Sequence, residues 1–172
     1  MINDGKSSDI ILRILKPEDV SEQYLAWNKD EDIVRYSDNQ YRNFTLDGQK
    51  DYVKACLYNR DIDLYGIFSG NTHIGNITIS GIESIHKRGE ITYVIGDKNY
   101  WNKGIASFAV SNMIMKAKSY RLHKLFAGLA HPNIGSKVVL EKNGFILEGV
   151  RRSHLCYNNT FYDQLDYGLL LA

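Results

Sequence analysis

The hydrophobic pattern changes its period at Gly96, and this change limits what the chain can fold into. Before it, residues 89–95 form a run with β-branched residues that predicts a strand. After it, Ile105, Ala109 and Met113 recur at helical spacing. A strand that leads through a short loop into an apolar helix is typical of a protein in which helices pack on a sheet.

Further strands and helices surround this unit. Strands are predicted at residues 10–15, 64–68, 73–80, 89–95, 124–130, 145–152 and 161–170. Helices are predicted at residues 18–27, 31–36, 45–59, 105–117 and 133–143. The order β-α-α-α-β-β-β-α-β-α-β-β favours an α/β or α+β fold, with one mixed sheet and helices on both of its sides.

Composition excludes several classes of protein. The 172 residues suit one domain, residues 1–172, and a hydrophobic share of 44% excludes a disordered chain. With 21 Lys and Arg against 20 Asp and Glu, the net charge of +1 argues against a nucleic-acid partner. Two distant cysteines and five scattered histidines lack the spacing of metal ligands, so we expect no metal site.

Neither end of the chain suggests export or a membrane. Residues 1–6 are polar and lack the order of a signal peptide. The longest apolar run, residues 169–172, is far below the ~20 residues of a membrane span. The sequence therefore predicts a cytoplasmic protein without a membrane partner, and it leaves a homodimer open.

Positive charge is concentrated in residues 83–125, which carry eight bases and three acids. A local basic segment in a neutral protein favours a ligand with several phosphates. Four bases lie near the end of this segment: Lys116, Lys118, Arg121 and Lys124. They could contact nucleotide phosphates, but a solvated helix face explains them better.

Two motifs carry the chemistry. In the first, Gly104 and Ala106 open the helix after Gly96, so its free N–H groups can bind a pyrophosphate. It is neither a P-loop nor a dinucleotide fingerprint. The second motif runs from Asn133 through Ser136 to residues 141–145, Glu-Lys-Asn-Gly-Phe. Alone, it would be a capped helix that ends in a glycine turn.

Together the two motifs resemble the GNAT N-acetyltransferase superfamily. The acetyl-CoA loop of that family reads Q/R-x-x-G-x-G/A, and Trp101-x-x-Gly104-x-Ala106 takes its place here. The Trp departs from the general pattern. The form Tyr-Trp-x-x-Gly-x-Ala is similar to that of the branch of ribosomal-protein alanine and amino-sugar acetyltransferases. Glu148-Gly149-x-x-Arg152, followed by Asp163, also resembles that branch. The resemblance covers residues 10–170.

The resemblance implies a single GNAT-like domain that binds acetyl-CoA as cosubstrate. Its mostly antiparallel sheet of six to seven strands would be splayed at the central strands. The exposed strand edge before the loop would pair with the pantetheine arm, and the loop amides would hold the pyrophosphate. The residues in these positions are Val94, Ile95, Gly96, Asn102, Lys103, Gly104, Ile105 and Ala106, with Asn133 on the arm or on a bound water.

The implied reaction is direct attack of an amine on the thioester, which needs a base and an acid. The family's general acid, a Tyr, is replaced here by Leu140, and Ser136 is the nearest substitute unless it only caps its helix. Glu90 is the best base candidate, although it could equally be a strand-face acid near Arg88. His154 and His131 rank behind it.

The acceptor is a small-molecule amine in our first interpretation. Removing the proton from an α-ammonium group at pH 7 costs roughly 1 kcal/mol, and removing it from a polyamine nitrogen costs about 4–5 kcal/mol. A site with weak acid and base groups therefore suits a less basic amine. The aromatic and cationic residues Trp27, Arg35, Tyr36 and Tyr41 suit a nucleotide-linked amino sugar, although Trp27 and Tyr36 could be core residues. The alternatives are a ribosomal-protein N-terminus as acceptor and a non-catalytic acyl-CoA-binding module.

Overall fold

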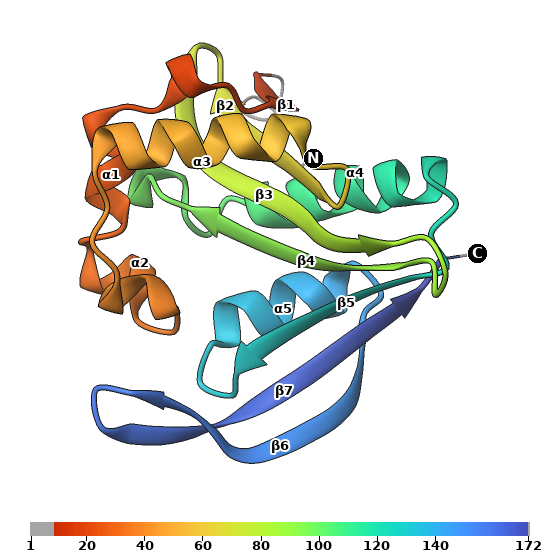
Figure 1. Cartoon of the computed structure of the whole chain (residues 1–172). Helices are drawn as coiled ribbons and strands as arrows, with labels where there is room; N and C mark the ends of the chain where they lie inside the picture. The colour runs from red at the N-terminus through yellow and green to blue at the C-terminus, as the bar shows by residue number, and fades with distance from the viewer. Residues whose placement is uncertain (1–8, 172) are drawn as a thin grey trace, which may run out of the picture.

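A seven-stranded sheet runs through the computed structural model, which describes residues 9–171 (Figure 1). Its spatial order is β1-β2-β3-β4-β5-β7-β6, and β4 with β5 is its one parallel pair among the described residues. The strands are β1 (Ile10–Ile14), β2 (Ile62–Ser69), β3 (Thr72–Glu83), β4 (Arg88–Ile95), β5 (Lys124–Ala130), β6 (Ile146–Tyr157) and β7 (Thr160–Leu170). The predicted fold class is confirmed, while the interpretation of residues 1–6 lies outside the described residues.

Helices cover both faces of the sheet. They are α1 (Glu22–Trp27), α2 (Glu31–Val34), α3 (Leu46–Tyr58), α4 (Ile105–Ser119) and α5 (Ile134–Lys142), with short 3₁₀ turns η1 (Pro17–Asp19), η2 (Asp38–Tyr41) and η3 (Lys98–Tyr100). Helix α3 packs on β2 together with α1 and η1, and α4 packs with α5 on the opposite face (Figure 1).

Several predicted boundaries were wrong, and two of them have a clear local reason. The helix predicted at 18–27 divides into η1 and α1, because Val20 is extended and the Ser21 side chain caps α1 by accepting from the N–H of Tyr24. The strand predicted at 145–152 continues to Tyr157. Its hairpin then turns at Asn158 and Asn159, whose φ angles of 49° and 60° suit a tight two-residue turn.

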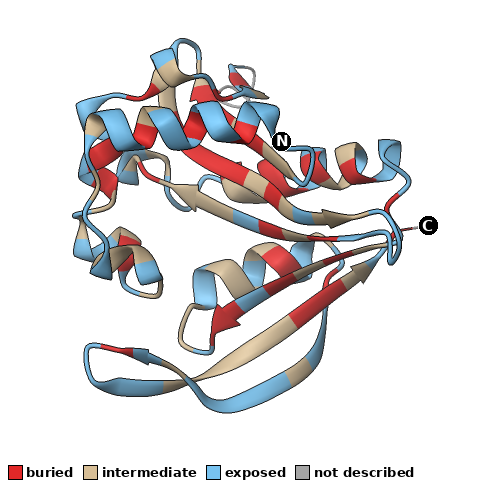
Figure 2. Cartoon of the chain, in the orientation of Figure 1, coloured by how far each residue is buried: buried red, intermediate tan, exposed pale blue. Residues whose placement is uncertain are grey.

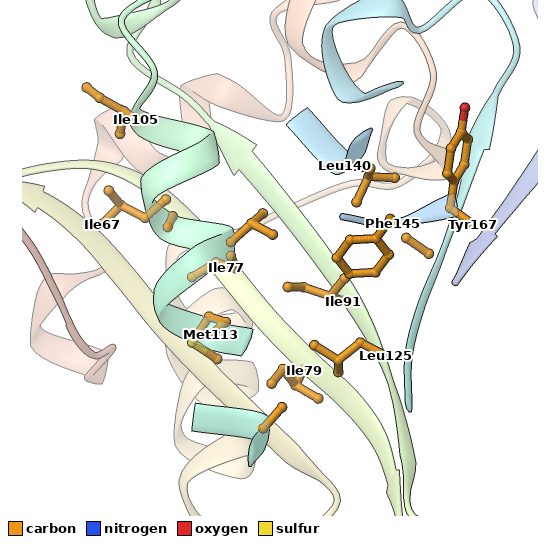
Figure 3. Packing of buried hydrophobic residues seen from close by; sticks show 14 of the residues in the cluster. Ile67, Ile77, Ile79, Ile91, Ile105, Met113, Leu125, Leu140, Phe145 and Tyr167 are labelled. Carbon is orange, nitrogen blue, oxygen red and sulfur yellow. The ribbon is translucent and has the colours of Figure 1, made fainter. Parts of the chain in front are cut away.

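The main core lies between α4, α5 and the sheet (Figures 2 and 3). Met113 of α4 packs with Ile77 and Ile79 of β3, which confirms the predicted helical stripe. Leu140 and Phe145 come from α5 and the turn after it, and they pack beside Ile91 and Tyr167 in the same cluster. A second cluster, built around Leu15, Val53 and Phe68, fills the space under α3.

The central strands separate after a short pairing. β4 and β5 pair only at Arg88–Lys124, Gly89–Leu125 and Glu90–Phe126. Beyond Glu90 the two strands diverge, whereas β4 stays paired with β3 as far as Ile95 and β5 with β7 as far as Ala130. The predicted splay of the central strands is therefore present, and it leaves one edge of β4 open.

A histidine is enclosed on the α3 side of the sheet. The ring of His73 stacks on Phe68 at 4.9 Å and contacts Trp27 at 5.0 Å between centroids. Its Nε2 lies 2.9 Å from the carbonyl oxygen of Gly75 and 2.8 Å from Oδ1 of Asn76. Because both are acceptors, Nε2 carries the proton, and Nδ1 is buried without a partner among the described residues. Burial lowers the pKa of His73.

Stability should therefore fall as the solution is acidified. The unfolded chain takes up the His73 proton below its ordinary pKa of 6.5, and the folded chain does so only at lower pH, so the free energy of unfolding decreases as pH falls through this window. His73→Gln removes the titration, and we expect its free energy of unfolding to change less between pH 7.5 and 5.5 than that of the parent. Urea unfolding at both pH values measures this.

The matched control is His154→Gln, which makes the same substitution at an exposed histidine outside the cluster around His73. Glu90 has a raised pKa and changes stability with the opposite sign, but it is present in all three proteins and cancels in the comparison. Equal pH dependence in the parent and His73→Gln would contradict the assignment.

Candidate functional site

A cleft of about 1340 Å³ opens where β4 and β5 separate. One end is lined by the loop after β4 and by the first turns of α4 and α5. The other end is lined by α1, α2 and the start of α3. The splay thus connects the two sides of the sheet through one continuous space.

The first end is built on the N-terminus of α4. Gly104 stands just before the helix with φ of 76°, a left-handed conformation that favours glycine. In any α-helix the first N–H groups have no acceptor within the helix, and here those of Ile105, Ala106 and Ser107 belong to residues that line the cleft. A Cβ at Gly104 would meet nothing within 4 Å, so the approach to these amides is open.

The indole of Trp101 ties this loop back to the sheet. Its Nε1 donates a hydrogen bond of 2.7 Å to the carbonyl oxygen of Ile95 at the end of β4. Trp101 and Asn102 both line the cleft, and Asn102 also has a left-handed φ, of 58°. Sequence reasoning missed this role of Trp101, because an indole N–H has no fixed partner until the strand end is placed.

Two predicted cofactor contacts do not reach the cleft. Gly96 lies under the ring of Trp27, and its N–H donates to the carbonyl oxygen of Ile74 at 2.9 Å. It therefore completes the pairing with β3 instead of facing the splay, while Val94 and Ile95 do line the cleft. Lys103 is placed over the ring of Tyr100, at 5.4 Å, outside the lining residues.

The first turn of α5 forms the opposite wall. Asn133 caps this helix, since its Oδ1 accepts from the N–H of Ser136 at 3.2 Å. Both side chains line the cleft, and none of the hydrogen bonds within residues 9–171 involves Oγ of Ser136. Leu140 is buried in the core, so no hydroxyl stands at that position.

Tyr93 spans the splay and was not singled out from the sequence. Its hydroxyl donates to the carbonyl oxygen of Ser136 at 3.1 Å, which joins β4 to α5. Burial raises its pKa to about 12, so the phenol stays protonated at neutral pH. A tyrosine in an alternating strand carries no signal for such a bond, because its partner lies 43 residues away in the sequence.

Glu90 sits where the splay begins, in the last residue pair of β4 with β5. It shares a face with Thr92 and Val94, which line the cleft, but Glu90 itself is outside the lining. Its half-buried carboxyl has a raised pKa, chiefly because burial disfavours the charge and further because Asp166 is near. The pairing with Arg88 does not form, since Arg88 contacts Glu83 at 3.1 Å instead.

Three of the four predicted acceptor residues line the second end of the cleft: Trp27, Arg35 and Tyr36. Trp27 is only 5% exposed, so it is a core residue and a cleft wall at once. Tyr41 does not line the cleft. It is 60% exposed, and its hydroxyl accepts from the N–H of Asn158 at 3.0 Å, which fastens η2 to the β6–β7 hairpin.

The other candidates lie elsewhere. His131 and His154 are outside the residues that line the cleft, and so are the four bases predicted for nucleotide phosphates or a solvated face. Lys124 is paired with Glu148 at 2.6 Å, and Lys116 lies over the ring of Tyr120 at 4.9 Å.

Within residues 9–171, no three His, Cys, Asp or Glu side chains are grouped as a metal site would need. None of the helices in the same range is long and apolar enough to cross a membrane.

A family model decides what this arrangement is. The model describes an acetyltransferase (GNAT) domain and matches residues 9–146. The chain belongs to the GNAT family. It is accordingly an N-acetyltransferase, and acetyl-CoA is its cosubstrate. The interpretation as a non-catalytic acyl-CoA-binding module is set aside.

Known proteins are similar to this GNAT chain along most of its length. The uncharacterized N-acetyltransferase YoaA of Bacillus subtilis is 27% identical over 165 residues, 94% of this chain and 93% of YoaA. The spermidine N-acetyltransferase of Vibrio cholerae, solved with CoA and spermine, has a TM-score of 0.84 at 19% identity, covering 95% of this chain and 96% of that one. The ribosomal L7/L12 acetyltransferase RimL, solved with CoA, has a TM-score of 0.85 at 21% identity, covering 96% of both chains. These two structures share the fold.

Proposed function

We propose that this GNAT enzyme binds acetyl-CoA in the splay, with the pyrophosphate on the first turn of α4. The free N–H groups of Ile105, Ala106 and Ser107 supply donors, and the positive end of the 15-residue helix adds a favourable field. The left-handed Gly104 keeps the approach to them open. Val94, Ile95 and Asn133 line the same cleft.

The pantetheine arm would pair with the open edge of β4. Gly96 directs its N–H to β3, so by alternation the backbone groups of Ile95 and Tyr93 face the splay. Trp101 already occupies the carbonyl of Ile95. The N–H of Ile95 and both backbone groups of Tyr93 remain for the amides of the arm, as when a strand is added to a sheet edge.

Gly104→Val tests this placement. A valine would be strained at φ of 76° and would project into the open approach to α4, so we expect CoA binding measured by calorimetry to be lost. Gly70→Val is the matched control. Gly70 also has a positive φ, 56°, and open space, but it lies in the β2–β3 turn. The control should lose similar stability and keep its affinity for CoA. Unchanged CoA affinity in Gly104→Val would contradict the placement.

Proton transfer falls to two residues in this proposal. Ser136 stands on the cleft wall in the first turn of α5, where its free Oγ could donate to the departing thiolate. A loss in kcat rather than in KM for Ser136→Ala separates this role from capping, since Asn133 supplies the cap. Glu90 would take the ammonium proton through a water, and its raised pKa makes it a stronger base than an exposed carboxylate.

Glu90→Gln keeps the shape and removes the base. A general base is typically worth about 10²–10⁴-fold, so kcat/KM should fall at least about a hundredfold at pH 7. The loss should shrink as pH rises toward the pKa of the amine, because free amine then forms unaided. The control is Glu83→Gln, which breaks the pair with Arg88 at the far end of β4. A near-normal rate with an unchanged pH profile in Glu90→Gln would remove this residue from the mechanism.

Our proposal for the substrate rests on the charge of the side chains at the acceptor end of the cleft. Uncharged hydrogen-bonding groups dominate the wall: Asn28, Asn39, Asn43, Gln49, Asn76, Thr78 and Thr92. Arg35 and Arg42 add positive charge. The one acid among the lining residues, Asp32, is paired with Lys98 at 2.7 Å and with Arg35 at 3.3 Å. Such a wall repels a polycation and suits an amine that carries hydroxyl groups or negative charge.

Buried polar side chains support a hydroxyl-rich acceptor. Gln49 is 6% exposed and donates to the hydroxyl of Tyr24 at 3.0 Å, and Asn76 is 7% exposed and accepts from His73. Gln49, Tyr24 and Asn76 line the cleft, and His73 does not. Buried polar groups are costly unless they are paired, and these can exchange partners with a sugar hydroxyl. We therefore infer a nucleotide-linked amino sugar as the acceptor.

A peptide N-terminus is the second candidate. The low pKa of an α-amino group, about 7.7–8.0, meets the same chemical requirement. The structural likeness to RimL, whose substrate is a ribosomal protein, favours it as well.

Turnover of acetyl-CoA with three amines tests the choice. We expect a nucleotide-linked amino sugar to be acetylated with the highest kcat/KM, an alanine-terminated peptide less efficiently, and spermidine least, because the arginine-bearing wall disfavours a polycation. Release of free CoA thiol measures the rate. Spermidine as the best substrate would overturn the argument from charge, and the peptide as the best substrate would favour the second candidate.

A further inference from the structure

A second hollow, of about 690 Å³, adjoins the acceptor end of the cleft. Its lining includes three cationic side chains, Lys29, Arg35 and Arg42, and one acid, Glu31. Amide side chains complete its polar lining: Asn28, Gln40, Asn43 and Asn158. A surface of this composition offers many hydrogen-bond donors and a positive field.

The cations of this hollow are largely uncommitted. Lys29 and Arg42 take part in no ion pair among residues 9–171, and Arg35 has a single exposed contact with Asp32 at 3.3 Å. An exposed pair of this kind is weak and leaves most donors of a guanidinium free.

The nearby acids are neutralised from elsewhere. Lys98, from the loop after β4, contacts both Asp30 and Asp32 at 2.7 Å. The positive charge of the hollow is therefore opposed on its own wall by Glu31 alone.

The hollow and the cleft share a wall. Asn28, Arg35, Arg42 and Asn43 line both spaces, so one extended ligand can reach from the splay into the hollow. Asn158, at the tip of the β6–β7 hairpin, closes the outer side, where its N–H is held by the hydroxyl of Tyr41. The hollow thus combines residues from the turn after α1, from α2 and η2, from the segment before α3 and from a hairpin more than a hundred positions later in the chain.

We propose that this hollow is an oxyanion site for a phosphate or diphosphate carried by the acceptor. The inference rests on the proposed function and names the group by which the acceptor is recognised. Guanidinium forks match the geometry of phosphate oxygens, and a lysine adds a point charge. The site is separate from the pyrophosphate of acetyl-CoA, which belongs to the first turn of α4 at the other end of the cleft.

Calorimetry of UDP binding tests the site without requiring turnover. Saturating CoA is present, so that UDP cannot occupy the first turn of α4. We expect the double variant Arg35→Gln/Arg42→Gln to bind UDP at least tenfold more weakly than the parent, because hydrogen bonds to charged groups are lost. Affinity in the parent should also fall as salt rises. Lys54→Gln is the matched control, since Lys54 is an exposed cation on α3 outside both spaces, and it should bind UDP like the parent.

Two further probes decide where the phosphate comes from. Uridine lacks the phosphates and should bind weakly to the parent and to the variant alike. Inorganic pyrophosphate should bind more weakly than UDP. If pyrophosphate binds as tightly as UDP, with the same dependence on the arginines, the site serves free oxyanions and the acceptor interpretation is overturned. UDP binding that is absent, or equal in the parent and the double variant, overturns the site itself. Melting temperatures confirm that the exposed substitutions leave the fold intact.

Failure of the proposed function gives a different result. If UDP binding depends on the arginines but no amino-sugar nucleotide is acetylated, the oxyanion site stands and the substrate assignment falls. If the nucleotide-linked amine is acetylated and the double variant leaves its KM unchanged, the assignment stands and the site falls. The expected result is a KM raised at least tenfold for the nucleotide-linked amine and less than twofold for the free amino sugar.

Discussion

The short parallel pairing between β4 and β5 is the constraint on which the rest of the structure depends. Three residue pairs hold these strands together, and after Glu90 each strand keeps only its outer neighbour. Ile91 of β4 and Leu129 of β5 pack in one core cluster with α4, α5 and Tyr167 of β7, and the two strands diverge beside that shared core. Side-chain hydrogen bonds join the two walls near the site: the hydroxyl of Tyr93 donates to the carbonyl oxygen of Ser136, and Nδ2 of Asn143, at the end of α5, donates to Oγ of Ser107 in α4. A backbone edge that would be an aggregation risk on a surface is thus enclosed in the cleft, where in our proposal the pantetheine arm pairs with it.

The fold and the lining of the cleft answer different questions. Proteins of this fold include enzymes named for spermidine and for a ribosomal protein, so the fold alone selects no acceptor. Here the lining has one acid, Asp32, and it is already paired with Lys98 and Arg35. The amides and arginines around it are what a hydroxylated, phosphate-bearing amine would require. In our proposal the choice of acceptor therefore depends on a small set of side chains, most of them within the first fifty residues.

Several local features of the cleft cost stability. Asn102 and Gly104 adopt left-handed backbone conformations, His73 buries an unpaired nitrogen, and Glu90 has a half-buried carboxyl. Strained backbone and buried polar groups lower the free energy of unfolding. They persist where the packing around them holds them in place. All four lie in or beside the cleft. Such features are not confined to it, since Lys87 and Ser153 also have left-handed φ angles and Oδ2 of Asp63 is buried without a partner among the described residues.

The sequence by itself determined the main elements and the family, and it placed a glycine directly before α4. Period changes in the apolar pattern reflect local backbone geometry, so all seven strands and the buried stripe of α4 could be predicted, and the glycine before α4 is a local requirement of φ. Tertiary structure alone decided which of the predicted residues meet. Gly96 turned out to complete a strand pair under Trp27, Tyr41 to fasten a hairpin, and Tyr93 to bridge the splay. Each of these roles depends on a partner dozens of positions away, and side-chain contacts over such separations leave no periodic trace in a single sequence.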